Sequence, residues 1–154
     1  MEKYDSTKET QEHIDKVSTY LHNVAKDLKV RGQVHDASKL QSPEKEYFNE
    51  YSPRLATLTY GTPEYLQNVQ DLKPALEHHF ANNSHHPQFY KEGLNGMNLY
   101  DLIEMFYDWR AATERGVNGD IMKSIKINAN RFGISKQLKQ ILINTENYEK
   151  AKTR

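Results

Sequence analysis

Apolar residues recur at helical spacing near the start of the chain. Five of them step by 3, 4, 3 and 4 positions, namely Ile14, Val17, Leu21, Val24 and Leu28. This spacing is typical of the apolar stripe of an amphipathic helix. Ser6 with Glu9 three positions later matches a capping box, and Gly32 is a typical residue after a helix end. We therefore predict a helix between Ser6 and Gly32.

Capping signals divide the middle of the chain into further helices. Ser42-Pro43-Glu44 and Thr62-Pro63-Glu64 each combine an N-cap residue, a proline and an acidic first turn. Pro74 interrupts the second of these helices, because proline lacks the backbone N–H and clashes with the preceding turn. Asn98 and Asp101 have the spacing of an N-terminal cap. Each signal predicts a helix start, and Pro74 predicts a kink or a restart.

Turn residues and the C-terminal part complete the pattern. Ser52-Pro53 with Tyr60-Gly61, and Gly116 to Gly119, predict loops, and residues 144–154 form a polar tail that we expect to fray. Two more helices are predicted in this part, one that begins near Ile121 and ends at Gly133 and one that begins after Ser135. No period-2 strand pattern occurs. The prediction is an all-α fold, a single-domain helical bundle of six or seven helices over residues 1–154.

Composition limits the function classes. The chain has 154 residues, with 21 basic and 21 acidic side chains and no cysteine. A zero net charge gives no strong nucleic-acid signal, and the lack of cysteine excludes disulfides and thiolate metal sites. No apolar run approaches the ~18 residues of a membrane helix, and the first residues do not form a secretory signal. We expect a soluble cytoplasmic protein without a membrane partner.

Histidine and aspartate supply the candidate chemistry. The pair His35-Asp36 offers a nitrogen and an oxygen ligand at consecutive positions, which suits a divalent metal. The pairs His78-His79 and His85-His86 place four of the seven histidines within nine residues. A solvated histidine-rich loop is the alternative. His13 lies beside the apolar stripe of the first helix, either as an exposed side chain or as a ligand.

The helix after Asn98 has two contrasting sides. An apolar arc contains Leu99, Leu102, Phe106, Trp109 and Arg110. Three acidic residues share the other side with Met105 and Ala112, and they are Asp101, Glu104 and Asp108. Like charges four residues apart repel when exposed and cost far more when buried without a cation. This side is either solvated, or turned inward with a metal that offsets the charge.

The order of the candidate ligands resembles that of the HD-domain superfamily of metal-dependent phosphohydrolases, which are helical bundles. These ligands are His13, His35-Asp36, His78-His79 and Asp108. The chain is also similar to a family of phage and bacterial proteins that share HDxSK, LEHH, HHP and GMNLxDLxEMxxDW patterns. The HD resemblance implies one divalent ion held by His13, His35, Asp36 and Asp108. It further implies a second ion between Asp36, His78, His79 and one of His85 or His86.

The same resemblance implies an enzyme that hydrolyses a phosphomonoester or phosphodiester in a nucleotide-like substrate, in a bacterial cell or a phage-infected host. Asp36, Lys39, His78 and His79 would be its catalytic residues. Lys39 and Arg110 are candidate phosphate contacts, and Asp101 and Glu104 would orient ligands. The metal could be Mn, Co, Ni, Fe, Zn or Mg.

Two other functions fit the sequence. The protein could keep the metal and sequester a nucleotide or signal without hydrolysing it, or it could be a helical protein–protein adaptor whose histidines bind no ion. Intact recovered nucleotide would indicate the first, and absence of stoichiometric metal would indicate the second. A homo-oligomer is compatible with all three.

Overall fold

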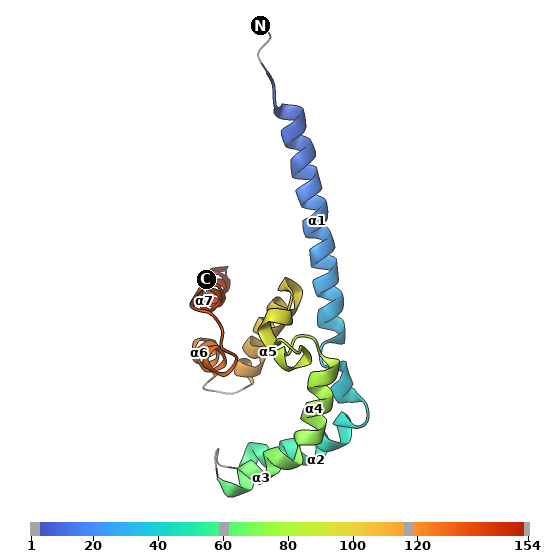
Figure 1. Cartoon of the computed structure of the whole chain (residues 1–154), viewed down its shortest axis with the longest axis vertical. Helices are drawn as coiled ribbons and strands as arrows, with labels where there is room; N and C mark the ends of the chain where they lie inside the picture. Colours follow the sequence, from blue (N-terminus) through green and yellow to red (C-terminus); the bar gives the residue numbers. More distant parts are fainter. Residues whose placement is uncertain (1–3, 59–61, 116–118, 153–154) are drawn as a thin grey trace. The chain divides into compact units, whose positions relative to one another are not determined.

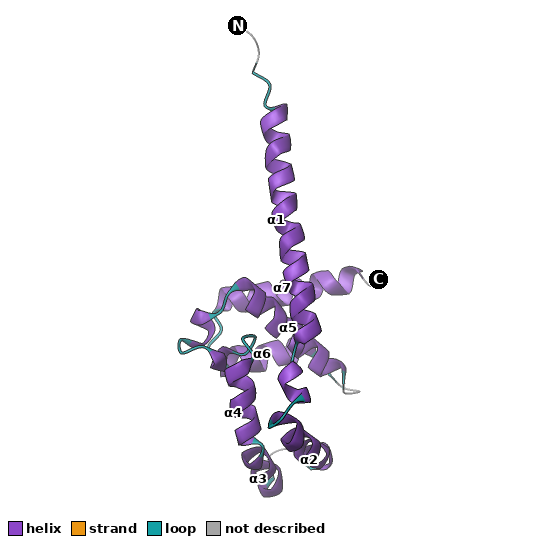
Figure 2. Ribbon diagram, turned by 90° about the vertical axis from the view of Figure 1, so that its right-hand side faces the viewer, coloured by secondary structure: helices purple, strands orange, loops and turns teal. Residues whose placement is uncertain are grey.

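The structure is a computed structural model that describes residues 4–58, 62–115 and 119–152. These residues form α-helices and three short 3-10 helices and contain no strand (Figures 1 and 2). The α-helices are α1 (Thr7–Val34), α2 (Glu44–Thr57), α3 (Pro63–Asp71), α4 (Lys73–Asn82), α5 (Leu99–Glu114), α6 (Ile121–Arg131) and α7 (Lys136–Lys152). The 3-10 helices are η1 (Ala37–Leu40), η2 (Pro87–Phe89) and η3 (Gly93–Gly96). The predicted all-α fold is confirmed.

The chain divides into two compact units, Met1–His35 and Asp36–Arg154. Each unit is described by itself. One domain over residues 1–154 stays a prediction.

The first unit consists of α1, a single uninterrupted helix (Figure 1). It begins directly after Ser6 as predicted, although the Ser6 side chain makes no capping hydrogen bond. The predicted end at Gly32 is wrong, because the helix continues to Val34. A glycine inside a helix costs roughly 1 kcal/mol relative to alanine, which a helix of this length tolerates. No residue of α1 is buried, so its apolar stripe has no packing partner within this unit.

The core of the second unit lies between α5, α6 and α7. Its buried apolar side chains are Met105, Phe106, Trp109, Ile121, Ile125 and Leu142. α6 packs against both α5 and α7 (Figure 1). Burial of such side chains contributes about 1.5–3 kcal/mol each relative to exposure. This core holds α5 in place, and α5 carries several of the predicted site residues.

The inward side of α5 differs from the predicted apolar arc. Phe106 and Trp109 are buried as predicted, but Leu99 is 74% exposed. Asp101 and Met105, from the acidic side, are buried completely or almost completely. The sequence left open whether the acidic side of α5 is solvated or turned inward. In the first two turns of the helix this side is turned inward. A helix with apolar residues on both sides cannot be oriented from periodicity alone, since its neighbours decide which side is covered.

Polar signals placed most helix ends correctly. Thr62 caps α3 by accepting a hydrogen bond from the Tyr65 backbone N–H, and Pro74 stands in the first turn of a new helix, α4. Gly133 ends α6 with a left-handed φ of 64°. Pro53 was expected in a loop, but it lies inside α2, which runs from Glu44 to Thr57. The loop signals at residues 60–61 and 116–118 lie outside the described residues.

The C-terminal segment is more ordered than predicted. Residues from 144 onward continue α7 as far as Lys152, rather than fraying. Glu146 is buried within this helix, and its carboxylate lies 3.3 Å from Lys150 Nζ and 3.8 Å from Arg110 Nε. A buried carboxylate with two cationic neighbours can order a segment that looks solvated in the sequence.

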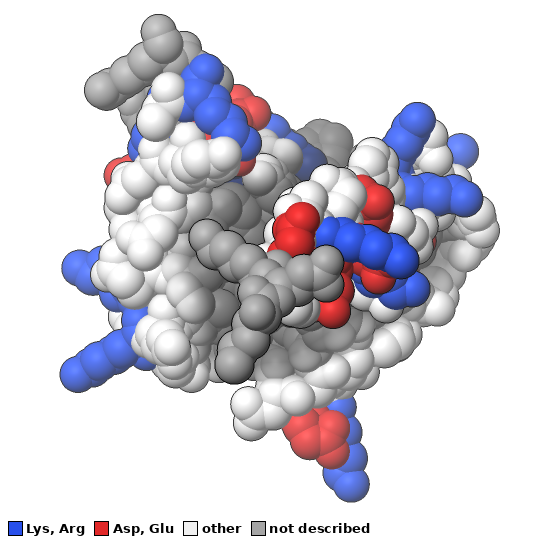
Figure 3. All heavy atoms as spheres, turned by 90° about the horizontal axis from the view of Figure 1, so that it is seen from above, with Lys and Arg blue, Asp and Glu red and all other residues white. Residues whose placement is uncertain are grey.

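None of the described helices is long and apolar enough to cross a membrane. Basic and acidic side chains both appear on the face drawn in Figure 3, in line with a net charge of zero over the whole sequence.

Candidate metal centre

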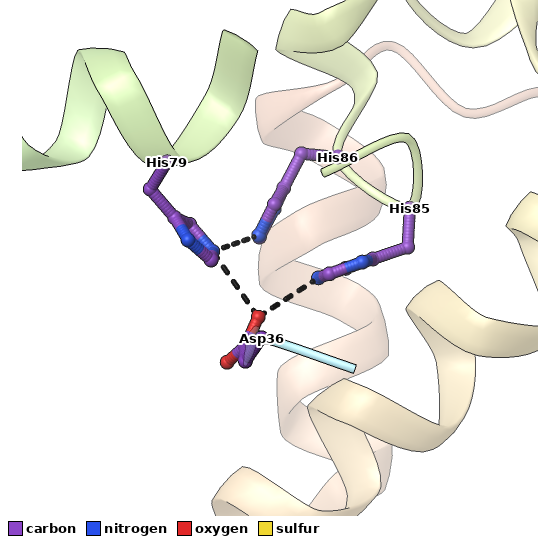
Figure 4. Close-up of side chains that lie close together, drawn as sticks. All are labelled: Asp36, His79, His85 and His86. Carbon is purple, nitrogen blue, oxygen red and sulfur yellow. Dashed lines mark hydrogen bonds and ion pairs between the residues drawn. The ribbon is translucent and has the colours of Figure 1, made fainter. Parts of the chain in front are cut away.

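One aspartate and three histidines of the second unit converge on a common point (Figure 4). We call Asp36, His79, His85 and His86 the ligand cluster. One ligand atom from each residue lies within 4.8 Å of the others. Asp36 Oδ1 lies 3.2 Å from His79 Nε2 and 3.4 Å from His85 Nε2. His79 Nε2 lies 2.8 Å from His86 Nε2.

Asp36 reaches the cluster from an uncommon backbone conformation. Its φ of 55° is left-handed, and it is the only described residue other than glycine with a positive φ. Aspartate tolerates this region better than most side chains, and such outliers concentrate at functional sites. Burial acts to raise the pKa of the Asp36 carboxyl group, but hydrogen bonds with His79, His85 and Lys39 outweigh it and hold the pKa far below its usual range. Asp36 is therefore ionised and could act as an anionic ligand.

His79 is oriented by a second carboxylate behind it. Its Nδ1 lies 2.9 Å from Glu44 Oε2, at the start of α2. Glu44 is completely buried, and it also accepts a hydrogen bond from Ser38 Oγ at 3.0 Å. With an ion at the cluster, the carboxylate beside Nδ1 would keep a proton on that nitrogen and leave the Nε2 lone pair for the ion.

His85 has the same arrangement on the other side of the cluster. Its Nδ1 lies 3.1 Å from Glu104 Oε1 on α5, and its side chain is almost fully buried. Glu104, which was expected to orient a ligand, therefore lies where it can orient His85. For His86, burial together with the neighbouring His85 and His79 lowers the pKa to about 3. A neutral imidazole is the form that binds metals.

The spacing of these atoms matches a metal site. Ligands held ~2.1 Å from one ion lie roughly 3.0–3.4 Å apart in octahedral or tetrahedral geometry. The three measured separations of 2.8, 3.2 and 3.4 Å are close to this range. The imidazoles of His79 and His85 are both backed by carboxylates, as metal-binding histidines usually are. The residues present therefore fit a divalent cation, to which they offer three nitrogen ligands and one oxygen ligand.

The segment that carries His85 and His86 is fastened to the start of α5 by Asp101. This buried carboxylate accepts hydrogen bonds from Ser84 Oγ at 2.8 Å and from Tyr90 Oη at 2.6 Å. It also accepts one from the Asn98 backbone N–H, which completes the capping box. Asp101 was expected to orient a ligand directly, but it positions the backbone on both sides of the histidine pair instead.

His13 and His35 are not brought together. They stand near opposite ends of α1, and 22 residues of continuous helix span roughly 33 Å. Since Asp36 is bonded directly to His35, the same length keeps His13 away from Asp36 however the two units are arranged. The expected site of His13, His35, Asp36 and Asp108 is therefore wrong in its first member. The sequence suggested a shared site because it does not show how long a helix remains unbroken.

His78 and Arg110 also lie elsewhere than predicted. Consecutive residues of a helix point about 100° apart, so His78 cannot face the cluster beside His79. Its Nδ1 lies 2.7 Å from Glu44 Oε1, and its side chain is 41% exposed. Arg110, a candidate phosphate contact, lies 3.5 to 3.8 Å from the carboxylates of Glu114, Glu146 and Glu149.

Lys39 and Asp108 remain near the cluster. Lys39 Nζ lies 2.6 Å from Asp36 Oδ2, on the oxygen that the histidines do not share. Asp108 offers a ligand atom within 4.8 Å of one on His85. Lys39 therefore lies beside the ligand cluster, and Asp108 lies near its member His85.

Three supporting residues were not identified as site residues from the sequence. Glu44 looked like an acidic first-turn residue, Ser38 like part of the His-Asp motif, and Asn83 like loop composition. In the structure Asn83 Nδ2 donates to Ser38 Oγ at 2.8 Å, and Ser38 donates to Glu44. The signal for Glu44 was its place at the start of a helix, which does not tell whether it faces solvent or a neighbouring helix.

Comparison with known proteins gives a family but no function. No curated protein and no solved structure matches the chain. A model described as a family of unknown function, DUF5662, matches residues 2–148. The match includes every residue of the ligand cluster and the carboxylates behind it. The chain therefore belongs to the DUF5662 family.

Proposed function

We propose that this protein is a divalent-metal-dependent phosphohydrolase that acts on a nucleotide-like phosphoester. The observation that carries the proposal is the convergence of Asp36 with the Nε2 atoms of His79, His85 and His86. The resemblance of the His-Asp and His-His motifs to HD-domain enzymes is a second support. The proposed ion shares only Asp36 with the first ion expected from the sequence. It is closer to the second, with both His85 and His86 as ligands and without His78.

The donor set favours some metals over others. Three imidazoles and one carboxylate suit Zn²⁺, Fe²⁺, Co²⁺, Ni²⁺ or Mn²⁺, whereas Mg²⁺ prefers oxygen ligands. Glu44 and Glu104 lie beside Nδ1 of His79 and His85, so both rings would keep a proton there and turn Nε2 toward an ion.

The residues around the cluster supply the parts that hydrolysis needs. When bound, a divalent ion makes water a stronger nucleophile and neutralises charge on phosphoryl oxygens. Lys39 would bind a phosphoryl oxygen, because its Nζ already lies beside an anionic oxygen of Asp36. Glu44 and Glu104 hold protons on the far sides of His79 and His85, which keeps both rings from turning away.

The test combines metal content with phosphate release. Purified protein is loaded with each candidate metal, dialysed and analysed for metal, then incubated with nucleoside monophosphates, triphosphates and cyclic dinucleotides. We expect about one tightly held ion per chain and metal-dependent turnover of at least one substrate. His79→Gln should lose both, whereas His22→Gln, on exposed α1, should lose neither.

Other outcomes separate the alternatives. Stoichiometric metal with every nucleotide recovered intact would favour the sequestering protein and contradict hydrolysis. A wild-type protein that holds no metal, or a His79→Gln protein that holds as much as wild type, would contradict the proposed centre and favour the adaptor.

A further inference from the structure

A pocket of about 340 Å³ lies between α5 and α6, and His86 forms part of its wall. His86 belongs also to the ligand cluster, so the pocket adjoins the cluster through this residue. Pockets that bind small molecules typically measure ~300–1,000 Å³. The volume therefore suits one small ligand and is too small for a polymer.

Aromatic rings form the apolar part of the pocket. Trp109 and Phe132 both line it, and their rings are almost parallel, with 7° between the planes and 6.3 Å between the centroids. The Arg131 guanidinium lies 4.9 Å from the centroid of the Phe132 ring. Aromatic rings and arginine planes are surfaces on which planar heterocycles stack.

The polar part of the pocket comes from one side of α6. Ser124, Asn128 and Arg131 are spaced by four and three residues, so they lie on the same side of the helix, and all three line the pocket. Asn128 Nδ2 donates to Ser124 Oγ at 3.3 Å, which uses one of the two N–H groups of the amide. The other N–H and the carbonyl form a donor–acceptor pair of the kind that reads the edge of a base.

The charges of the pocket favour a neutral occupant. Asp108 contributes one negative charge to the lining and Arg131 one positive charge. Asp108 interacts electrostatically with His86, which also lines the pocket, and opposes a second anionic group there. A phosphoryl group would therefore lie at the ligand cluster, and an uncharged ring would extend into the pocket.

We propose that this pocket binds the planar base of a nucleoside monophosphate whose phosphoryl group lies at the ligand cluster, an inference that rests on the proposed function. Trp109 and Phe132 provide the apolar surface for the ring, and Asn128 pairs with its edge. Arg131 covers the ring from the α6 side. The identity of the base is thus selected by α6, apart from the residues that hold the ion.

Fluorescence provides a direct test, because Trp109 is the only tryptophan in the chain. The full-length protein in EDTA is titrated with AMP, GMP, CMP, UMP, ribose 5-phosphate and inorganic phosphate, with free tryptophan as the absorbance control. We expect at least one nucleotide to change the emission saturably, and ribose 5-phosphate and phosphate to leave it unchanged. Asn128→Leu should raise the dissociation constant of that nucleotide about fivefold or more.

Two further variants control for folding and charge. Arg131→Gln should also weaken binding, whereas Lys126→Gln, which removes the same charge from the same helix outside the pocket lining, should not. Circular dichroism verifies that all three remain helical. Nucleotides that act no differently from ribose 5-phosphate, or unchanged binding in both Asn128→Leu and Arg131→Gln, would overturn the inference. The titration is done in EDTA, so the fluorescence response does not depend on the ion. A wild-type protein that shows this response but binds no metal would contradict the metal centre and leave the base pocket intact.

Discussion

At the scale of residues, charge and backbone conformation meet at Asp36. Its left-handed φ of 55° aims the carboxylate at three imidazoles, while Lys39 occupies the second oxygen. Asparagine and aspartate are the residues other than glycine that commonly adopt the αL conformation. Of the two, only aspartate carries a negative charge.

Asp36→Asn separates these two requirements. The variant keeps the preferred backbone conformation, so we expect a small change in melting temperature for the metal-free protein. It removes the anionic ligand, so the dissociation constant for the metal should rise at least about 100-fold. Calorimetric titration with Zn²⁺ or Co²⁺ measures the affinity. An affinity equal to that of wild type would show that Asp36 does not bind the ion.

Glu104→Gln tests the support behind His85. Loss of a carboxylate that orients a metal-binding histidine typically costs about 10–100-fold in metal affinity. Glu114→Gln on the same helix is the matched control, because Glu114 is exposed, lies 3.5 Å from Arg110 and does not belong to the ligand cluster. We expect metal affinity to fall in the first variant and to stay at the wild-type value in the second. Equal affinities would contradict the role of Glu104.

The pKa of His86 gives a pH dependence. Its folded-state pKa of about 3 lies below the ordinary histidine value near 6.5, so the unfolded chain binds the proton more readily. The free energy of unfolding of the metal-free protein should therefore fall as the pH drops below about 6.5. Urea denaturation in EDTA at pH 7.5 and pH 5 measures the fall, which should be roughly 1–2 kcal/mol smaller in His86→Gln. An identical fall in both proteins would contradict the lowered pKa of His86.

At the scale of elements, the start of α5 organises the site without touching the proposed ion. The capping box of Asn98 and Asp101 fixes the helix start, and the same Asp101 carboxylate holds Ser84 and Tyr90. The histidine pair between those two residues is thereby attached to a helix of the core. A capping signal that is readable in the sequence thus has a second role that is visible only in three dimensions.

Asp101→Ala should accordingly cost more than an ordinary cap. An N-cap loss such as Asp120→Ala at α6 is expected to cost about 1 kcal/mol in unfolding free energy. Asp101→Ala leaves buried partners unsatisfied and should cost about 2–4 kcal/mol. Metal affinity should fall in Asp101→Ala and not in Asp120→Ala. Equal costs, measured by urea denaturation, would indicate that Asp101 only caps the helix.

Helix ends and helix surroundings differ in how well the sequence predicts them. Thr62, Pro74, Gly133 and Ser135 marked ends correctly, because capping and turn chemistry is local. Which side of α5 is buried, and whether Glu44 faces inward, depend on neighbouring helices and could not be read locally. The ligand cluster was predicted in part, since its members were recognised as candidates while their grouping depends on tertiary packing.

At the scale of the whole molecule, the two units divide the predicted metal ligands. The ligand cluster lies entirely within Asp36–Arg154, whereas His13 belongs to a continuous helix of the other unit. Helix length alone keeps His13 roughly 30 Å from Asp36. The resemblance in sequence placed His13 in the site, and the continuity of α1 removes it.

His13→Gln therefore distinguishes the sequence-based site from the one described here. We expect metal stoichiometry and affinity equal to wild type, because no ligand of the cluster is altered. Metal analysis beside His79→Gln provides the comparison. If His13→Gln lost the ion, α1 would have to break and bring its first turns to the cluster.

X-ray absorption spectroscopy of the protein loaded with Zn²⁺ or Co²⁺ tests the central claim most directly, because imidazole rings give a distinct scattering pattern around the metal. The account predicts about three imidazole nitrogens and one carboxylate oxygen at ~2.0–2.2 Å, with one imidazole fewer in His85→Gln. A metal surrounded by oxygen ligands with one imidazole or none, or a spectrum unchanged in His85→Gln, would contradict it.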